Sequence, residues 1–163
     1  MSDHAAVTQE PITEQSVSLL KETVEILGGP RYVVGRIRTE LDVHDVIVKK
    51  FSGRVLTYVM KNTLIMKGRD LSIATGIKIR TAQRIKAYSS KALSLEQSGR
   101  LWKFAEVLAK ATDVFGTREA AENWLTAPAI AFRQKRPIDL LESPKGAELV
   151  EQLLGRIDRN VYT

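Results

Sequence analysis

The residues of this sequence best suited to a chemical task are cations and amides gathered after a glycine. Five residues that follow Gly76 are of types that contact nucleic acid: Lys78, Arg80, Thr81, Gln83 and Arg84. Guanidinium and ammonium groups bind phosphates or the edge of guanine, a glutamine amide pairs with adenine, and threonine contacts the backbone or a thymine methyl. These types are typical of a helix that reads DNA. A basic helix face that is merely solvated has a similar composition.

Charge is distributed unevenly along the chain. Residues 30–100 carry fifteen Lys and Arg against five acids, a net charge of +10, whereas residues 1–29 have a net charge of −4 and residues 101–163 a net charge of 0. From Lys49 to Lys91 there are eleven basic side chains and one acid, Asp70. A segment with this positive charge is suited to binding the phosphate backbone of nucleic acid. The charge pattern together with the residue types after Gly76 favours DNA binding.

The composition leaves little room for catalysis. The chain has no cysteine and only two histidines, so we predict no metal site and no cofactor. Two carboxylate pairs have helical i, i+3 spacing, Glu119 with Glu122 and Glu148 with Glu151. Such pairs on exposed helices are ordinarily solvated, and no phosphate-binding or nucleophile motif accompanies them. We therefore predict that the protein is not an enzyme.

Composition also indicates where in the cell the protein is expected. Hydrophobic residues make up 44% of the 163 residues, and no apolar run approaches the length of about 18 residues that a membrane span needs. The N-terminal residues are polar and acidic, unlike a signal peptide. The expected location is the cytoplasm, with no membrane partner.

Hydrophobic periodicity predicts an all-α fold. Residues 1–15 have no periodic pattern and are expected to form a flexible tail, and a helix follows from Ser16 to the glycines at 28 and 29. Residues 31–51 are rich in β-branched side chains, but no turn dipeptide joins them as a hairpin, so a helix is predicted there too. Residues 55–64 again have helical spacing.

A pair of short helices is expected around Gly76. Ser72, Gly76 and Ile77 fall where a helix-turn-helix needs a small residue, a turn glycine and an apolar plug. We expect the apolar side of the second helix to face the core through Ile79, Ala82 and Ile85.

Capping signals define the helices of the last third. Ser94 to Gln97 has the form of a capping box that opens a long helix with a buried stripe from Leu101 to Thr112. Thr117 begins the next helix, a brief one follows at Pro137–Leu141, and Ser143 with Pro144 begins the last. The aromatic residues expected in the core are Trp102, Phe104, Phe115 and Trp124. Tyr162 is either a tail residue that packs back or an anchor for a partner.

Short blocks in the last third resemble the Xre/MbcA/ParS family of antitoxins. These blocks are Ala111–Gly116, Glu119–Leu125, Pro128, Arg136–Leu141, Gly146, Leu153–Ile157 and Val161–Tyr162. With Arg80, Thr81 and Arg84 and the Leu93–Leu101 segment, the resemblance extends over about residues 70–163. The family often has glycine before the terminal Val-Tyr, where this chain has Asn160, a residue that also tolerates left-handed backbone.

The resemblance implies an Xre-like helix-turn-helix DNA-binding domain followed by a small helical toxin-binding domain. The expected boundaries are 16–92 for the N-terminal region, with the helix-turn-helix at about 70–90, and 93–163 for the toxin-binding domain. Family members are homodimers within a larger toxin-antitoxin complex, and their partner is a cognate RES-domain toxin that consumes NAD.

The family's mechanism then assigns roles to the last residues. The C-terminal helix and tail would occlude the toxin's active site, and the residues expected to bind the toxin are Arg156, Asp158, Arg159, Val161 and Tyr162. The dimer would bind operator DNA and repress its own operon. A stand-alone helix-turn-helix transcriptional regulator is the alternative.

Overall fold

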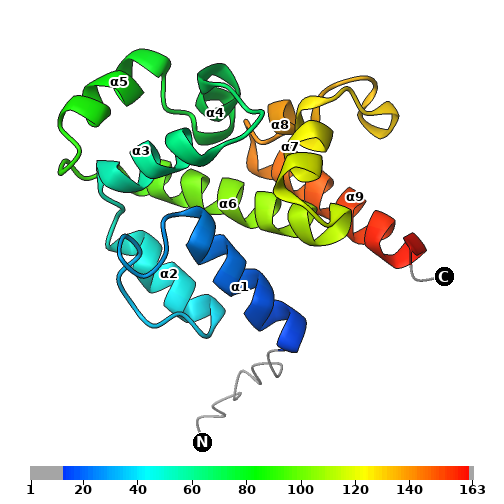
Figure 1. Ribbon diagram of the computed structural model, residues 1–163, viewed down its shortest axis with the longest axis horizontal. Helices are drawn as coiled ribbons and strands as arrows, with labels where there is room; N and C mark the ends of the chain where they lie inside the picture. The colour runs from blue at the N-terminus through cyan, green and yellow to red at the C-terminus, as the bar shows by residue number, and fades with distance from the viewer. Residues whose placement is uncertain (1–12, 162–163) are drawn as a thin grey trace, which may run out of the picture.

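The computed structural model describes residues 13–161, with side chains up to residue 160, and this part of the chain is built from helices (Figure 1). The elements are α1 (Glu14–Ile26), α2 (Glu40–Val48), α3 (Gly53–Asn62), α4 (Gly68–Thr75), α5 (Ile79–Ala87), α6 (Leu95–Phe115), α7 (Arg118–Thr126), the 3-10 helix η1 (Ile130–Phe132), α8 (Pro137–Leu140) and α9 (Pro144–Val161). Residues 13–161 form no strand beyond two isolated bridges. The all-α prediction is confirmed. None of these helices combines the length and the apolar character needed to cross a bilayer.

Helix α6 runs through the middle of the molecule (Figure 1). It packs against α1, α2, α4, α7 and α9, and Leu101 and Phe104 are almost completely buried at these contacts. Buried side chains from Ile26 to Leu154 form one contiguous cluster around it. The division of the chain at residue 93 therefore stays a prediction, because α6 belongs to the packing of both parts.

The capping box predicted at the start of α6 is present. The Ser94 hydroxyl accepts a hydrogen bond from the backbone N–H of Gln97 at 3.0 Å, and the Gln97 side chain accepts one from the N–H of Ser94 at 2.9 Å. At the other end the helix stops at Gly116, whose φ of 87° lies in the left-handed region that favours glycine. Two local signals in the sequence thus define both ends of the central helix.

Helix α1 begins two residues earlier than the periodicity indicated. The Thr13 side chain caps the helix by accepting from the N–H of Ser16 at 3.2 Å, so Glu14 and Gln15 are helical although they fall in the expected tail. The rest of that tail, residues 1–12, lies outside the described residues.

The helix predicted for residues 31–51 forms only in part. Residues 31–39 are turns and loop, and α2 begins at Glu40 behind a capping box between Thr39 and Asp42. The prediction was wrong for 31–39, where Val33 is buried but Val34 is 75% exposed, and for 49–51, which follow the end of α2 at Val48. The β-branched residues at 31–39 lie in a loop, where they differ in burial and do not share a helical face.

The last two helices meet at a close backbone contact. Ser143 caps α9, its hydroxyl accepting from the N–H of Gly146 at 3.0 Å, and Pro144 stands at the first helical position as predicted. A Cβ added to Gly146 would lie 1.8 Å from the carbonyl oxygen of Leu140, so only glycine fits here. This contact sets the angle at which α9 leaves α8.

Candidate functional site

A tight turn at Gly76 joins α4 to α5. Gly76 has a φ of 70°, and the neighbouring Ile77 is 2% exposed. The guanidinium of Arg100 covers the turn, since a Cβ added to Gly76 would lie 2.2 Å from its Nη1. Its Nη2 donates to the carbonyl oxygen of Ile73 at 2.9 Å. The structure thus contains the predicted pair of short helices, with α6 holding the turn between them.

Helix α5 turns one face to solvent. Ala82 and Ile85 are buried as predicted, but Ile79 is 46% exposed, so the prediction that it faces the core was wrong. It stands at the first position of the helix, beyond the reach of the packing that buries the other two. The residues expected to contact DNA lie on the outer side: Lys78, Arg80, Gln83 and Arg84 are exposed, and Thr81 is half-buried.

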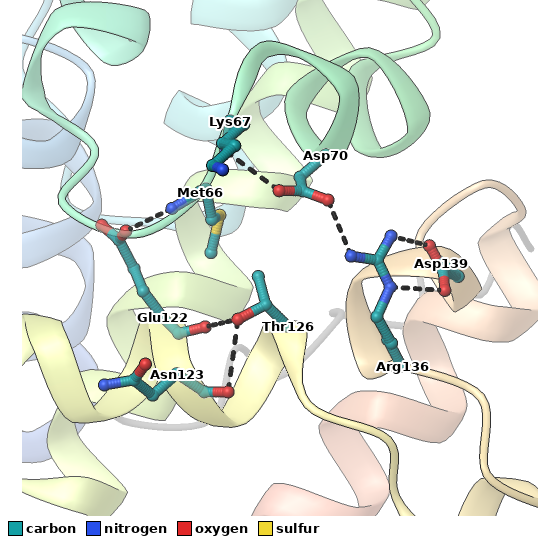
Figure 2. Close-up of polar contacts among 8 residues, drawn as sticks. All are labelled: Met66, Lys67, Asp70, Glu122, Asn123, Thr126, Arg136 and Asp139. Carbon is teal, nitrogen blue, oxygen red and sulfur yellow. Dashed lines mark hydrogen bonds and ion pairs between the residues drawn. The ribbon is translucent and has the colours of Figure 1, made fainter.

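Glu122 on α7 holds the segment that leads into α4. Its Oε2 accepts hydrogen bonds from the backbone N–H groups of Leu64, Ile65 and Met66 at 2.9, 2.6 and 3.1 Å, and Figure 2 shows the one from Met66. The Glu122 side chain is completely buried. The expectation that the Glu119 and Glu122 pair is solvated was therefore wrong for Glu122, whereas Glu119 is exposed.

Arg136, which precedes α8, is bound by two acids (Figure 2). Its Nη1 donates to Asp70 Oδ1 at 2.9 Å, and its Nε and Nη2 donate to the two oxygens of Asp139 at 2.9 and 2.7 Å. The hydrogen bonds to Asp139 raise the pKa of Arg136 above its ordinary value; burial opposes this, and the contact with Asp70 adds to it. Asp70 in turn accepts from the N–H of Lys67 at 2.9 Å and so caps α4.

These contacts fix α7 and α8 to the helix pair. Glu122 binds the main chain ahead of α4, Arg136 binds its first turn, and Arg100 donates both to Ile73 on α4 and to the carbonyl of Glu142 at 3.2 Å. Sequence reasoning missed all three. Asp70 could have indicated the contact with Arg136, because it is the single acid in a basic run. The contacts of Glu122 could not be predicted in this way, because they involve main-chain N–H groups that almost any residue at 64–66 would provide.

The first half of α9 is anchored on α6. Ala147, Val150 and Leu154 are buried, and Glu151 accepts hydrogen bonds from Lys103 at 3.2 Å and Lys110 at 3.3 Å. Burial lowers the pKa of Lys103, but Glu106 and Glu151 more than offset this, so the pKa is raised above its usual value. Charged contacts and apolar packing together hold this part of α9 in place.

The last turns of α9 extend beyond the other helices (Figure 1). Arg156 and Arg159 are exposed, and Asp158 is half-buried. The helix continues through Asn160 to Val161, so Asn160 does not adopt the left-handed backbone that it would tolerate. The side chain of Val161 and the whole of Tyr162 lie outside the described residues.

Comparison with known proteins finds a similarity in this C-terminal part. Residues 110–159 match the family model described as the antitoxin Xre/MbcA/ParS C-terminal toxin-binding domain. These residues are similar to the toxin-binding domain of the Xre/MbcA/ParS family. They cover the last six residues of α6, then α7, η1 and α8, and most of α9. Glu122, Arg136 and the anchoring residues of α9 therefore all lie within the residues that match this family model.

Three curated relatives are each named Antitoxin Xre. The protein from Yersinia enterocolitica is 32% identical over 91 residues, which cover 55% of this chain and 61% of the relative. The one from Photorhabdus laumondii is 32% identical over 98 residues, covering 60% and 65%. The one from Pseudomonas putida is 34% identical over 65 residues, covering 40% and 41%. The chain thus spans about two fifths to two thirds of the relatives it matches. Their names agree with the prediction that the protein is not an enzyme.

Proposed function

We propose that this chain is an antitoxin that neutralises a cognate RES-domain, NAD-consuming toxin by occluding its active site. As a DNA-binding homodimer it would also repress its own operon. The observation that carries the proposal is the match of residues 110–159 to the Xre/MbcA/ParS toxin-binding domain. The names of the three relatives support the same function.

The form of α9 supports the toxin-binding part of the proposal. Its first half is fixed by buried apolar residues and by Glu151, while Arg156 and Arg159 near its end are exposed. A rigid base with a projecting end loses little conformational entropy on entering a cleft, which favours tight binding. The proposed contact residues are Arg156, Asp158, Arg159, Val161 and Tyr162.

The outer face of α5 supports the DNA-binding part. Arg80, Gln83 and Arg84 are exposed side by side on one short helix, and Ala82 and Ile85 pack its opposite face. Arginine pairs with guanine and glutamine with adenine in the major groove, so these residues are proposed to read bases. Lys78 and Thr81 are proposed to contact phosphates.

Truncation after Gly155 tests the inhibitory role of the end of α9. Co-expression of the full chain with the RES-domain toxin encoded beside it is expected to restore growth and NAD levels. The truncated chain is expected to lose this rescue completely, because the proposed contact residues are gone while Leu154 and the anchored half of α9 remain. Colony counts and cellular NAD measure the effect.

Two controls give this test its meaning. Helical circular dichroism of the truncated protein should match that of the full chain, which separates lost contacts from unfolding. Lys145→Ala changes an exposed residue at the start of the same helix and should leave rescue intact. Full rescue by the truncated chain, or the absence of any toxin that the full chain neutralises, would contradict the proposal.

The double variant Arg80→Ala, Arg84→Ala tests the DNA-reading helix. Each good contact between arginine and guanine contributes about 1–3 kcal/mol, so loss of both is expected to weaken operator binding by about 100-fold or more. Fluorescence anisotropy with DNA from upstream of the gene, at constant salt, measures the change. Stability and toxin neutralisation should stay as in the wild type, since both side chains are exposed. Unchanged affinity would refute the assignment.

A further inference from the structure

A basic hollow lies beside α5, on the side formed by α3 and the loop that follows α1. It has a volume of about 530 Å³. Four cations line it, Arg31 from the loop, Arg54 and Lys61 from α3, and Lys86 from α5. Two tyrosines, Tyr32 and Tyr58, also line it, together with Thr57 and Ser89. None of these residues belongs to the proposed DNA-reading set.

The cations of this basic hollow are not neutralised. No carboxylate is among the described residues that line it, and none of the four cations forms an ion pair with a described acid. The C-terminal half differs, since five of its cations are paired there: Lys103, Lys110, Arg118, Arg136 and Lys145. A cluster of like charges that repel one another favours an anionic ligand.

The framework of the hollow is well fixed. On α3, Arg54 and Lys61 lie seven residues apart and so share one helical face with Tyr58 between them. The ring centroids of Tyr32 and Tyr58 are 5.7 Å apart. Gly53 contacts α5 so closely that an added Cβ would lie 2.4 Å from Ile85. The loop, α3 and the end of α5 therefore present their cations at set positions.

The hollow is continuous with the proposed DNA-reading face. Lys86 lies three residues after Gln83 on α5, which makes the two neighbours on the helix surface. We propose that the basic hollow binds the phosphate backbone of the DNA strand that flanks the bases read by α5. The inference rests on the proposed DNA binding and adds a second, sequence-independent contact surface to it. Long, exposed lysine and arginine side chains suit a continuous polyanion, and they position the protein without reading sequence.

The double variant Arg54→Gln, Lys61→Gln tests the basic hollow without altering α5. Each phosphate contact contributes about 0.9 to the slope of log K against log salt, so the slope should fall by about 1 to 2. Affinity near 0.1 M salt should drop on the order of tenfold or more, equally for upstream DNA and for a scrambled duplex of the same length. Anisotropy titrations over a series of salt concentrations measure both quantities.

Matched controls separate the outcomes. Lys135→Gln with Lys145→Gln removes the same charge from exposed residues of the C-terminal part and should leave slope and affinity nearly unchanged. Gln83→Ala should weaken binding to upstream DNA and spare the scrambled duplex. If the Arg54 and Lys61 variant has the slope and affinity of the wild type, the inference is wrong. The proposal that α5 reads DNA would not be affected by that result. Failure of the wild type to bind either duplex would contradict the inference and the DNA-binding function together.

Discussion

Replacing Glu122 with alanine is expected to lower the free energy of unfolding by about 2–4 kcal/mol. The side chain is completely buried, and its Oε2 is the acceptor for three consecutive backbone N–H groups. A buried donor that loses its acceptor costs about 1–3 kcal/mol. Leu64 and Ile65 are partly exposed and can turn to water, but Met66 is buried, so the loss falls mainly on its N–H. Urea unfolding monitored by circular dichroism measures the change.

Two further variants sharpen this test. Glu119→Ala, one helical turn earlier and exposed, should change stability by no more than about 0.5 kcal/mol. Glu122→Gln keeps the volume of the side chain but replaces one acceptor oxygen with a donor, so it should be intermediate. Wild-type stability in Glu122→Ala would show that the loop ahead of α4 does not depend on this carboxylate.

Gly146→Ala should be destabilising by about 3 kcal/mol or more, although alanine is the better helix former. The added Cβ would lie 1.8 Å from the oxygen and 2.7 Å from the carbonyl carbon of Leu140, and backbone atoms cannot move aside as a flexible side chain can. Either α9 must tilt away from α8 or the Ser143 cap must break. Thermal and urea unfolding of the purified variant measure the loss.

The same helix offers an opposite control. At Gly155 an added Cβ meets no other described atom within 4 Å outside its own helix and neighbours. Gly155→Ala should therefore stabilise the protein by about 0.5–1 kcal/mol, the usual gain of alanine over glycine in a helix. Two identical substitutions nine positions apart thus have opposite expected signs. Equal effects at both positions would contradict the close contact between α8 and α9.

Local signals in the sequence predicted local structure well. Ser94 with Gln97, Thr117 and Ser143 all cap helices as expected, because a cap depends only on residues within three or four positions. The failures have a common cause. Residues 31–39 and Ile79 were assigned from residue types, but their burial depends on which distant helices lie nearby.

The candidate binding surfaces were also predictable only where they depend on residues close together in the sequence. The exposed basic face of α5 follows from helical spacing and charge, which the sequence contains. The basic hollow joins residues from 31 to 89, and the contacts of Glu122 and Arg136 reach back more than fifty positions. Long-range contacts of this kind depend on the packing of α6 with its neighbours, and a single sequence carries no direct sign of them.

The contacts that hold α7 and α8 to the N-terminal half differ in how well they would tolerate a change of sequence in that half. Glu122 recognises only main-chain groups, so it could dock onto almost any sequence at residues 64–66 that keeps the same backbone path. Arg136 needs a specific acid, Asp70. In a chimaera that grafts the C-terminal segment onto another N-terminal half, the first attachment would transfer unaided. The second would survive only if the recipient carried a carboxylate at the equivalent of position 70, which makes this one residue the compatibility marker between the halves.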